Sequence, residues 1–246
     1  MINKVLGTFD EAVAGIPDGA TVMMGGFGPP GMPRNLIAAL LRQGAKDLVF
    51  IANTHGYPGN FMDMGRLVEA RRIRKMICSF TAAPRPSRVV AFEIMHEAGE
   101  VEAELVPQGT LAERIRAAGA GIGAFYTPTS AGTLVAEGKE HRTINGREYV
   151  LEYPLHADYA LVRAHRADSW GNLQYRLSQR NFNPIMAQAA RVTLVEVEEE
   201  ILEPGAIDPD HVHTPGIFVD RVVRIPPPPE GIWEEALNIS VESKYT

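Results

Sequence analysis

Residues 18–33 read DGATVMMGGFGPPGMP, and this stretch predicts a strand, a glycine-rich loop and the start of a helix. Thr21 to Met24 form a short β-prone run after an Asp-Gly turn. The glycines that follow allow positive φ angles, so the backbone can lie close against a ligand. Pro33 suits the first position of a helix, which we expect over residues 34–42. The loop contains four glycines, Gly25, Gly26, Gly28 and Gly31.

The last three of these glycines satisfy the dinucleotide-binding pattern G-x-G-x-x-G. Two features weigh against a nicotinamide site. Pro29 and Pro30 remove two backbone N–H donors where a pyrophosphate would need them. The next predicted strand, residues 48–53, ends without the acidic side chain that would bind a ribose hydroxyl. A tight turn that binds no ligand is the competing interpretation.

Alternation of apolar strands with amphipathic helices predicts a parallel α/β sheet. Residues 48–52 form a continuous apolar run, which is typical of a strand buried on both faces. Asn145-Gly146 between two β-prone arms predicts a hairpin. Asn183 followed by Pro184 predicts a helix start, with Asn183 as the N-cap. Further strands are expected over residues 76–80, 101–105, 157–164, 192–197 and 219–225.

The composition of the 246-residue chain is that of a globular protein with a sizeable core, since 45% of residues are hydrophobic and 22% charged. A formal net charge of −6 argues against nucleic acid or an anionic membrane as the main partner. The single cysteine, Cys78, has apolar neighbours, so we expect a buried thiol and a reducing compartment. The chain shows no signal-peptide pattern and no apolar run of membrane-spanning length, so we expect a cytoplasmic location.

A second candidate site lies at Gln108, between a predicted strand end and a predicted helix start. Alternation over residues 101–105 predicts a half-exposed strand. Thr110 and Glu113 form a capping box, which places Thr110 at the N-cap and Gln108 in the turn before it. An amide in that turn can donate to a developing oxyanion or orient a carboxylate. A purely structural turn residue is the competing interpretation.

Two further loops are ambiguous on sequence alone. Residues 53–64 are polar and glycine-rich and follow a strand end, where α/β sheets bind ligands, but a plain connector fits equally well. Residues 208–216 contain two aspartates and two histidines. Their spacing matches no compact ligand set, so we expect no metal site.

Residues 18–33 resemble the signature of the family I CoA-transferases, and more narrowly of their A (α) subunits. Segments 104–114, 120–129 and 167–184 resemble further A-chain segments of 3-oxoacid and 3-oxoadipate CoA-transferases. One departure is Gly123, where a proline is common in the family. The signature positions are Asp18-Gly19, Gly25-Gly26-Phe27, Gly31 and Pro33.

The resemblance, which covers about residues 4–225, implies a fold and substrates. The implied fold is an open, mostly parallel α/β sheet with flanking helices, of the CoA-transferase (ribose-phosphate isomerase-like) type, over residues 1–225. The proline run would lead a C-terminal tail, residues 226–246. The implied substrates are a coenzyme A thioester and a carboxylic acid, with no bound cofactor.

The resemblance also implies a division of the site between two chains. An enzyme glutamate attacks the donor thioester, and in two-subunit members it lies on the B (β) subunit, in a Ser-Glu-Asn-Gly type motif. This sequence contains no such motif. We therefore predict the A (α) subunit of a hetero-oligomer that moves CoA from an acyl-CoA, with succinyl-CoA as the expected donor, to a 3-oxo acid. Gln108 would polarise or orient the carbonyl of the intermediate. The implied CoA-binding residues are Gly25, Gly26, Phe27, Gly28, Pro29, Pro30 and Gly31.

Two other functions stay open on sequence alone. A hydrolase or lyase subunit on the same scaffold would use CoA thioesters without transfer to an acid. A non-catalytic CoA-binding module would keep the fold and have no partner with a glutamate motif. Product analysis separates the first from a transferase, because hydrolysis releases free CoA and transfer yields a new acyl-CoA.

Overall fold

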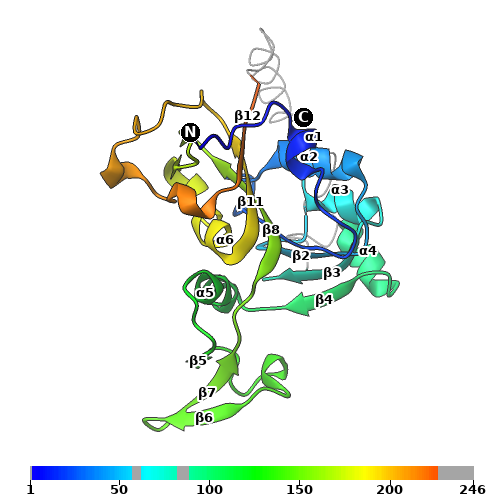
Figure 1. Ribbon diagram of the computed structural model, residues 1–246. Helices are drawn as coiled ribbons and strands as arrows, with labels where there is room; N and C mark the ends of the chain where they lie inside the picture. The colour runs from blue at the N-terminus through cyan, green and yellow to red at the C-terminus, as the bar shows by residue number, and fades with distance from the viewer. Residues whose placement is uncertain (1, 57–61, 82–88, 227–246) are drawn as a thin grey trace, which may run out of the picture.

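The computed structural model describes residues 2–56, 62–81 and 89–226, and it is built around one seven-stranded sheet (Figure 1). The strand order is β12-β11-β8-β1-β2-β3-β4, and every neighbouring pair runs parallel. The predicted open parallel sheet is thus confirmed. Its strands are β1 (Thr21–Met24), β2 (Leu48–Ala52), β3 (Ile73–Cys78), β4 (Glu102–Leu105), β8 (Ala157–Ala164), β11 (Ala190–Val197) and β12 (Arg221–Arg224).

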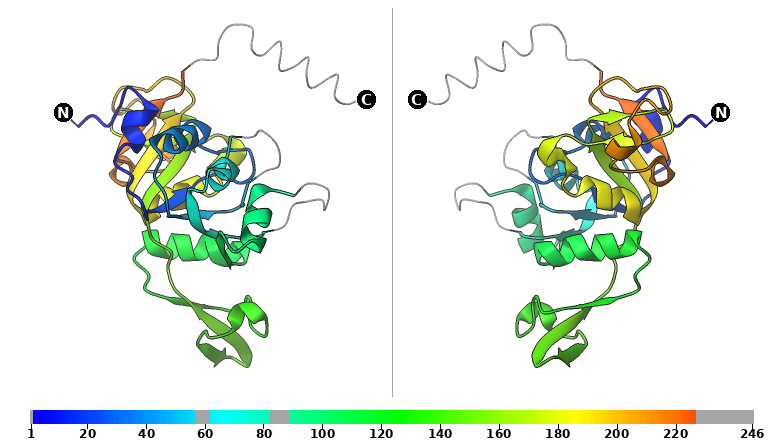
Figure 2. Two further views of the ribbon diagram at one scale, coloured as in Figure 1. Left: turned by 90° about the vertical axis from the view of Figure 1, so that its right-hand side faces the viewer. Right: turned by 90° about the vertical axis from the view of Figure 1, so that its left-hand side faces the viewer.

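Helices cover both faces of the sheet, which is why its central strands are apolar at nearly every position (Figures 1 and 2). Successive residues of β1 enter opposite cores. Val22 and Met24 pack with α1 to α4, whereas Met23 packs with α5 and α6. The helices are α1 (Phe9–Val13), α2 (Arg34–Gln43), α3 (Met64–Glu69), α4 (Ala91–Glu97), α5 (Gln108–Gly119) and α6 (Asn183–Ala189).

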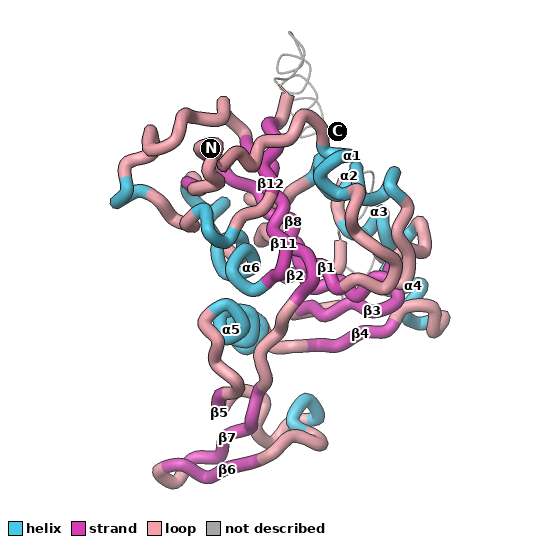
Figure 3. The backbone as a smooth tube through the Cα atoms, viewed as in Figure 1, coloured by secondary structure: helices cyan, strands magenta, loops and turns pink. Residues whose placement is uncertain are grey.

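A three-stranded antiparallel sheet, residues 125–152, projects away from the body, and we call it the arm (Figure 3). Its strand order is β5-β7-β6. The predicted hairpin joins β6 to β7, and the φ angles of Asn145 and Gly146 are 51° and 77°. Two positive φ angles in a two-residue turn match the right-handed twist of the flanking strands. The arm strands are β5 (Phe125–Thr127), β6 (His141–Ile144) and β7 (Arg147–Glu152).

Short elements complete the described chain. A two-stranded antiparallel ribbon lies beside the main sheet, and four 3₁₀ turns lie in the connections. No helix within the described ranges is long and apolar enough to cross a lipid bilayer. The predicted C-terminal tail lies outside the described residues except for Pro226. These elements are β9 (Arg166–Ala167), β10 (Leu173–Gln174), η1 (Leu134–Ala136), η2 (Leu177–Arg180), η3 (Pro209–His211) and η4 (Gly216–Phe218).

The predicted capping box of α5 is wrong. The helix begins at Gln108 with Pro107 at the N-cap, so Thr110 lies inside the first turn and is buried. Glu113 binds the guanidinium of Arg116 instead of reaching back to the helix start. The chain turns into the helix directly after Pro107, earlier than the local pattern suggests.

Three other boundaries differ from the predictions. Phe182, not Asn183, is the N-cap of α6, and the Asn183 side chain contacts a distant loop. Pro33 is the N-cap of α2 and not its first helical residue. The strand expected over residues 76–80 is β3, which ends at Cys78 and starts earlier, where Lys75 binds Glu104 of β4 (2.8 Å).

Candidate functional site

The glycine loop, residues 25–31, lies at the carboxyl end of β1, in the middle of the sheet. The chain places β2, β3 and β4 on one side of β1 and β8, β11 and β12 on the other. Parallel α/β sheets bind ligands beyond the strand ends at such a switch point. The N–H of Gly25 donates to the Leu161 carbonyl of β8 (2.9 Å), so the loop leaves the sheet here.

Glycine is required at three positions of the loop, because Gly26, Gly28 and Gly31 have φ angles of 106°, 66° and 76°. The Phe27 N–H closes a turn by donating to the Pro30 carbonyl (3.2 Å). Within the described residues, the N–H groups of the three positive-φ glycines donate to no protein acceptor. The loop therefore keeps backbone donors that a ligand could use.

The outer surface of the loop is apolar. Phe27 is 49% exposed, and part of the Pro29-Pro30 pair faces solvent as well. The Phe27 ring stacks on Phe182, with the ring centroids 6.5 Å apart and the planes 16° apart. The loop can thus offer apolar contact to a ligand without collapsing onto the body.

Gln108 is exposed and lies just beyond the carboxyl end of β4. Its Nε2 donates to Oδ1 of Asn53 (2.7 Å), and the Ser79 hydroxyl donates to the same oxygen (3.3 Å). Asn53 directly follows β2 and is 2% exposed, whereas Ser79 directly follows β3. Three adjacent strand ends therefore converge on one amide oxygen. Sequence reasoning did not single out Asn53, although its place at the start of the ambiguous loop 53–64 was a signal.

The loop and Gln108 share one edge of the sheet but are not in contact. Three strand spacings of about 4.8 Å separate β1 from β4, which is about 14 Å. The structure thus places all the sequence-predicted site residues along the same edge, in two groups. The gap between the groups is wide enough for part of an extended ligand.

Glu196 of β11 caps the helix that follows the glycine loop. This side chain is fully buried, and it accepts the N–H groups of Asn35 (2.8 Å) and Leu36 (3.1 Å) at the start of α2. Pro33 offers no capping side chain, so the cap comes from the sheet. Burial raises the pKa of Glu196 to about 7, while Arg163 (3.3 Å) opposes the rise. Sequence reasoning missed this residue, whose signal was an acid inside an apolar strand.

Two other titratable groups near the strand ends are structural. His55 is 1% exposed, its Nδ1 lies 3.0 Å from the Phe80 carbonyl, and burial lowers its pKa. Cys78 is fully buried, as predicted, and burial raises the pKa of its thiol to about 11. Neither group has the exposure that a nucleophile or proton carrier needs. No cluster of three or more His, Cys, Asp or Glu side chains in the described part of the chain could hold a metal ion.

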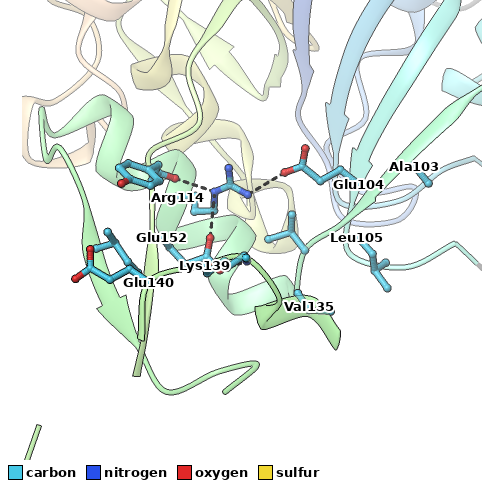
Figure 4. A pocket seen from close by; sticks show the side chains of 12 residues that line it. Ala103, Glu104, Leu105, Arg114, Val135, Lys139, Glu140 and Glu152 are labelled. Atoms are coloured by element: carbon cyan, nitrogen blue, oxygen red, sulfur yellow. Dashed lines mark hydrogen bonds and ion pairs between the residues drawn. The ribbon is translucent and has the colours of Figure 1, made fainter. Parts of the chain in front are cut away.

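A cavity of about 670 Å³ lies between the body and the arm (Figure 4). Arg114 of α5 points into it and binds Glu104 (3.1 Å) and Glu152 (3.7 Å). Lys139 of the arm also binds Glu152 (2.5 Å). Its charges pair with one another, and its lining contains no residue of the glycine loop. We therefore place the candidate site at the strand edge.

Comparison with known proteins identifies the family. The model of the Coenzyme A transferase family matches residues 7–224. The chain belongs to this family, as its sequence motifs predicted. It is 53% identical over 225 residues to the A chain of 3-oxoadipate CoA-transferase from Pseudomonas putida, covering 92% of this chain and 95% of the relative. It is 44% identical over 223 residues to the A chain of succinyl-CoA:3-ketoacid coenzyme A transferase from Helicobacter pylori (strain J99), covering 91% and 93%.

A solved CoA-transferase shares the fold. The chain superposes with a TM-score of 0.77 and 23% identity on an acyl-CoA transferase of Escherichia coli O157:H7, whose structure is a thioester complex with CoA. The match covers 93% of this chain and 48% of the other, so this CoA-transferase family member spans about half the length of that protein. The similarity confirms the CoA-transferase fold that the sequence predicted.

Proposed function

We propose that this chain is the A (α) subunit of a two-subunit CoA-transferase that moves CoA from an acyl-CoA to a 3-oxo acid. The observation that carries the proposal is the match, over more than 90% of both chains, to two A chains of enzymes named for 3-oxoadipate and 3-keto acids. The partner is a B (β) subunit, which contributes the nucleophilic glutamate. The complex works in the cytoplasm with succinyl-CoA as the donor.

The chemistry proceeds by covalent catalysis on the partner's glutamate. Its carboxylate attacks the thioester carbonyl, and the CoA thiolate leaves to give a mixed anhydride. The thiolate then attacks the glutamyl carbonyl, which releases the first acid and forms an enzyme-CoA thioester. The acceptor acid reverses the two steps, so no resident cofactor takes part.

This chain supplies binding and orientation. The glycine loop lines the channel of the pantetheine arm, with Phe27, Pro29 and Pro30 as apolar contacts and Gly28 as a backbone donor. Gln108 donates through its amide to the carbonyl oxygen that becomes negative in the tetrahedral intermediate. The support for this role is that Gln108 is exposed, while its contact with Asn53 fixes its amide (2.7 Å).

The test uses the chain alone and in complex with the product of an adjacent reading frame that carries a glutamate motif. Each sample is incubated with succinyl-CoA and either acetoacetate or 3-oxoadipate, and mass spectrometry follows acyl exchange and CoA adducts. We expect exchange only in the complex, with the adduct on a partner glutamate. Full-rate exchange by the isolated chain would contradict the proposal. Release of free CoA without exchange would instead support a hydrolase, a function that the relatives' names do not favour.

A further inference from the structure

The glycine loop is held by residues 181–183, which lie about 150 positions later in the chain. Asn181 Nδ2 donates to the Pro30 carbonyl (3.0 Å), and Asn183 Nδ2 donates to the Gly31 carbonyl (3.1 Å). The phenylalanine between them stacks on Phe27 of the loop. Three consecutive residues therefore each make a contact with the loop.

Asn183 has the most complete set of contacts. It is fully buried, and its Oδ1 accepts the Arg163 N–H of β8 (2.9 Å). Its Nδ2 donates to the carbonyls of Gly31 (3.1 Å) and Gln179 (2.9 Å). Both ends of the amide are thus used, and one side chain joins the loop to the sheet and to the η2 turn. A buried amide with several good partners has one defined orientation.

The glycines at the two ends of the loop make room for this amide. A Cβ atom on Gly25 would lie 1.9 Å from Oδ1 of Asn183. A Cβ atom on Gly31 would lie 2.5 Å from its Nδ2. Glycine is therefore required at both positions because the loop closes around Asn183, in addition to any requirement from a ligand.

We propose that Asn183 is a positioning residue that holds the glycine loop in the shape that binds acyl-CoA. It acts through the loop and does not touch the substrate, and this inference rests on the proposed CoA-binding role of the loop. Loss of its hydrogen bonds leaves the Gly31 carbonyl and the Arg163 N–H without their partner. The loop then takes several conformations, and only a fraction of them binds acyl-CoA.

The first test compares Asn183→Ala with wild type in the complex with the partner chain. We expect the KM for succinyl-CoA to rise about tenfold, as the loss of buried hydrogen bonds to one side chain predicts. We expect kcat to change by less than about threefold, because the partner glutamate and Gln108 stay in place. Thr193→Val is the matched control, since the Thr193 hydroxyl is buried and donates to the Ala187 carbonyl of α6 (2.9 Å), away from the loop. It should lower Tm and leave the KM unchanged.

The second test measures the loop without catalysis. Hydrogen–deuterium exchange of the substrate-free complex should be faster over residues 21–34 in Asn183→Ala and unchanged there in Thr193→Val. If wild type transfers no CoA, the proposed function fails, while this measurement still decides whether Asn183 holds the loop. Should the alanine variant not fold, Asn183→Asp keeps the acceptor for the Arg163 N–H and loses both donors, so it should show the same rise in KM. An unchanged KM in a folded variant, or a fall in kcat alone, overturns the proposal.

Discussion

At the scale of single residues, the orientation of Gln108 is set before any substrate binds. Its amide nitrogen is tied to the buried Asn53, and the Ser79 hydroxyl supports the same oxygen. An exposed glutamine without such contacts would sample many rotamers and lose entropy on binding. This preorganisation favours a role in stabilising charge over one in simply closing a turn.

Replacing Gln108 by alanine should therefore reduce kcat of the complex by roughly 100-fold, the cost of losing one oxyanion donor. The KM for acyl-CoA should change little, because the glycine loop is intact. Gln43→Ala is the matched control, since Gln43 lies at the far end of α2 and its amide nitrogen donates to the Ile16 carbonyl (2.9 Å). Steady-state kinetics that give the same kcat for both variants would argue against the catalytic role of Gln108.

Cys78 should be inert in the native protein. Its side chain is fully buried, and its pKa is raised to about 11, so the thiolate is scarce and shielded at about pH 8. Iodoacetamide should leave the native chain unlabelled and should modify one site after denaturation, as read by intact-protein mass spectrometry. Cys78→Ala should keep the transfer rate of the complex. Stoichiometric labelling of the native chain would show that the β3 end opens readily.

At the scale of elements, strands were easier to predict than helix ends. The strands β2, β8 and β11 follow from apolar runs, because both faces of the sheet are covered by helices. The start of α2 depends on Glu196, which is 161 positions away from Asn35, and no local pattern contains that information. The site divides in the same way. The glycine loop was predictable from its own residues, whereas Asn53 becomes recognisable only when adjacent strand ends are brought together.

The cap of α2 should make stability depend on pH. Burial raises the folded-state pKa of Glu196 to about 7, above an unfolded value of about 4.3. Between these values the folded state binds more protons than the unfolded state, so the contribution of Glu196 to stability falls as pH rises and is constant above about pH 7. Tm of wild type minus Tm of Glu196→Gln should therefore fall from about pH 5 to about pH 7 and then level off. A difference that does not vary with pH would show that Glu196 ionises normally.

At the scale of the whole molecule, a line of alternating charges joins the body to the arm. It runs from Lys75 through Glu104, Arg114 and Glu152 to Lys139 (Figure 4). Arg114 and Glu152 are only 13% and 3% exposed, so water screens this line less than ordinary surface ion pairs. Arg114 also donates to the Tyr153 carbonyl (2.8 Å), where the arm leaves the body. The sequence predicted the hairpin of the arm, but its position depends on these long-range contacts.

Arg114→Met should destabilise the chain by about 2–3 kcal/mol, because it leaves the buried carboxylate of Glu152 with one fewer partner. The variant should show a lower Tm and faster proteolysis within residues 125–152. Arg116→Met is the matched control on the same helix, since Arg116 is 47% exposed and pairs with Glu113 at the surface. Equal Tm values for the two variants would mean that the charge line does not hold the arm.

The arm also leaves and rejoins the body at neighbouring points, because Phe125 pairs with Glu152 across β5 and β7. A segment whose two ends are adjacent can be inserted, deleted or exchanged without changing the path of the chain on either side. Recombination at these two points would graft another arm onto an unchanged sheet. Related genes can thus diversify this appendage by cassette exchange, while the strand edge that holds the glycine loop is inherited intact.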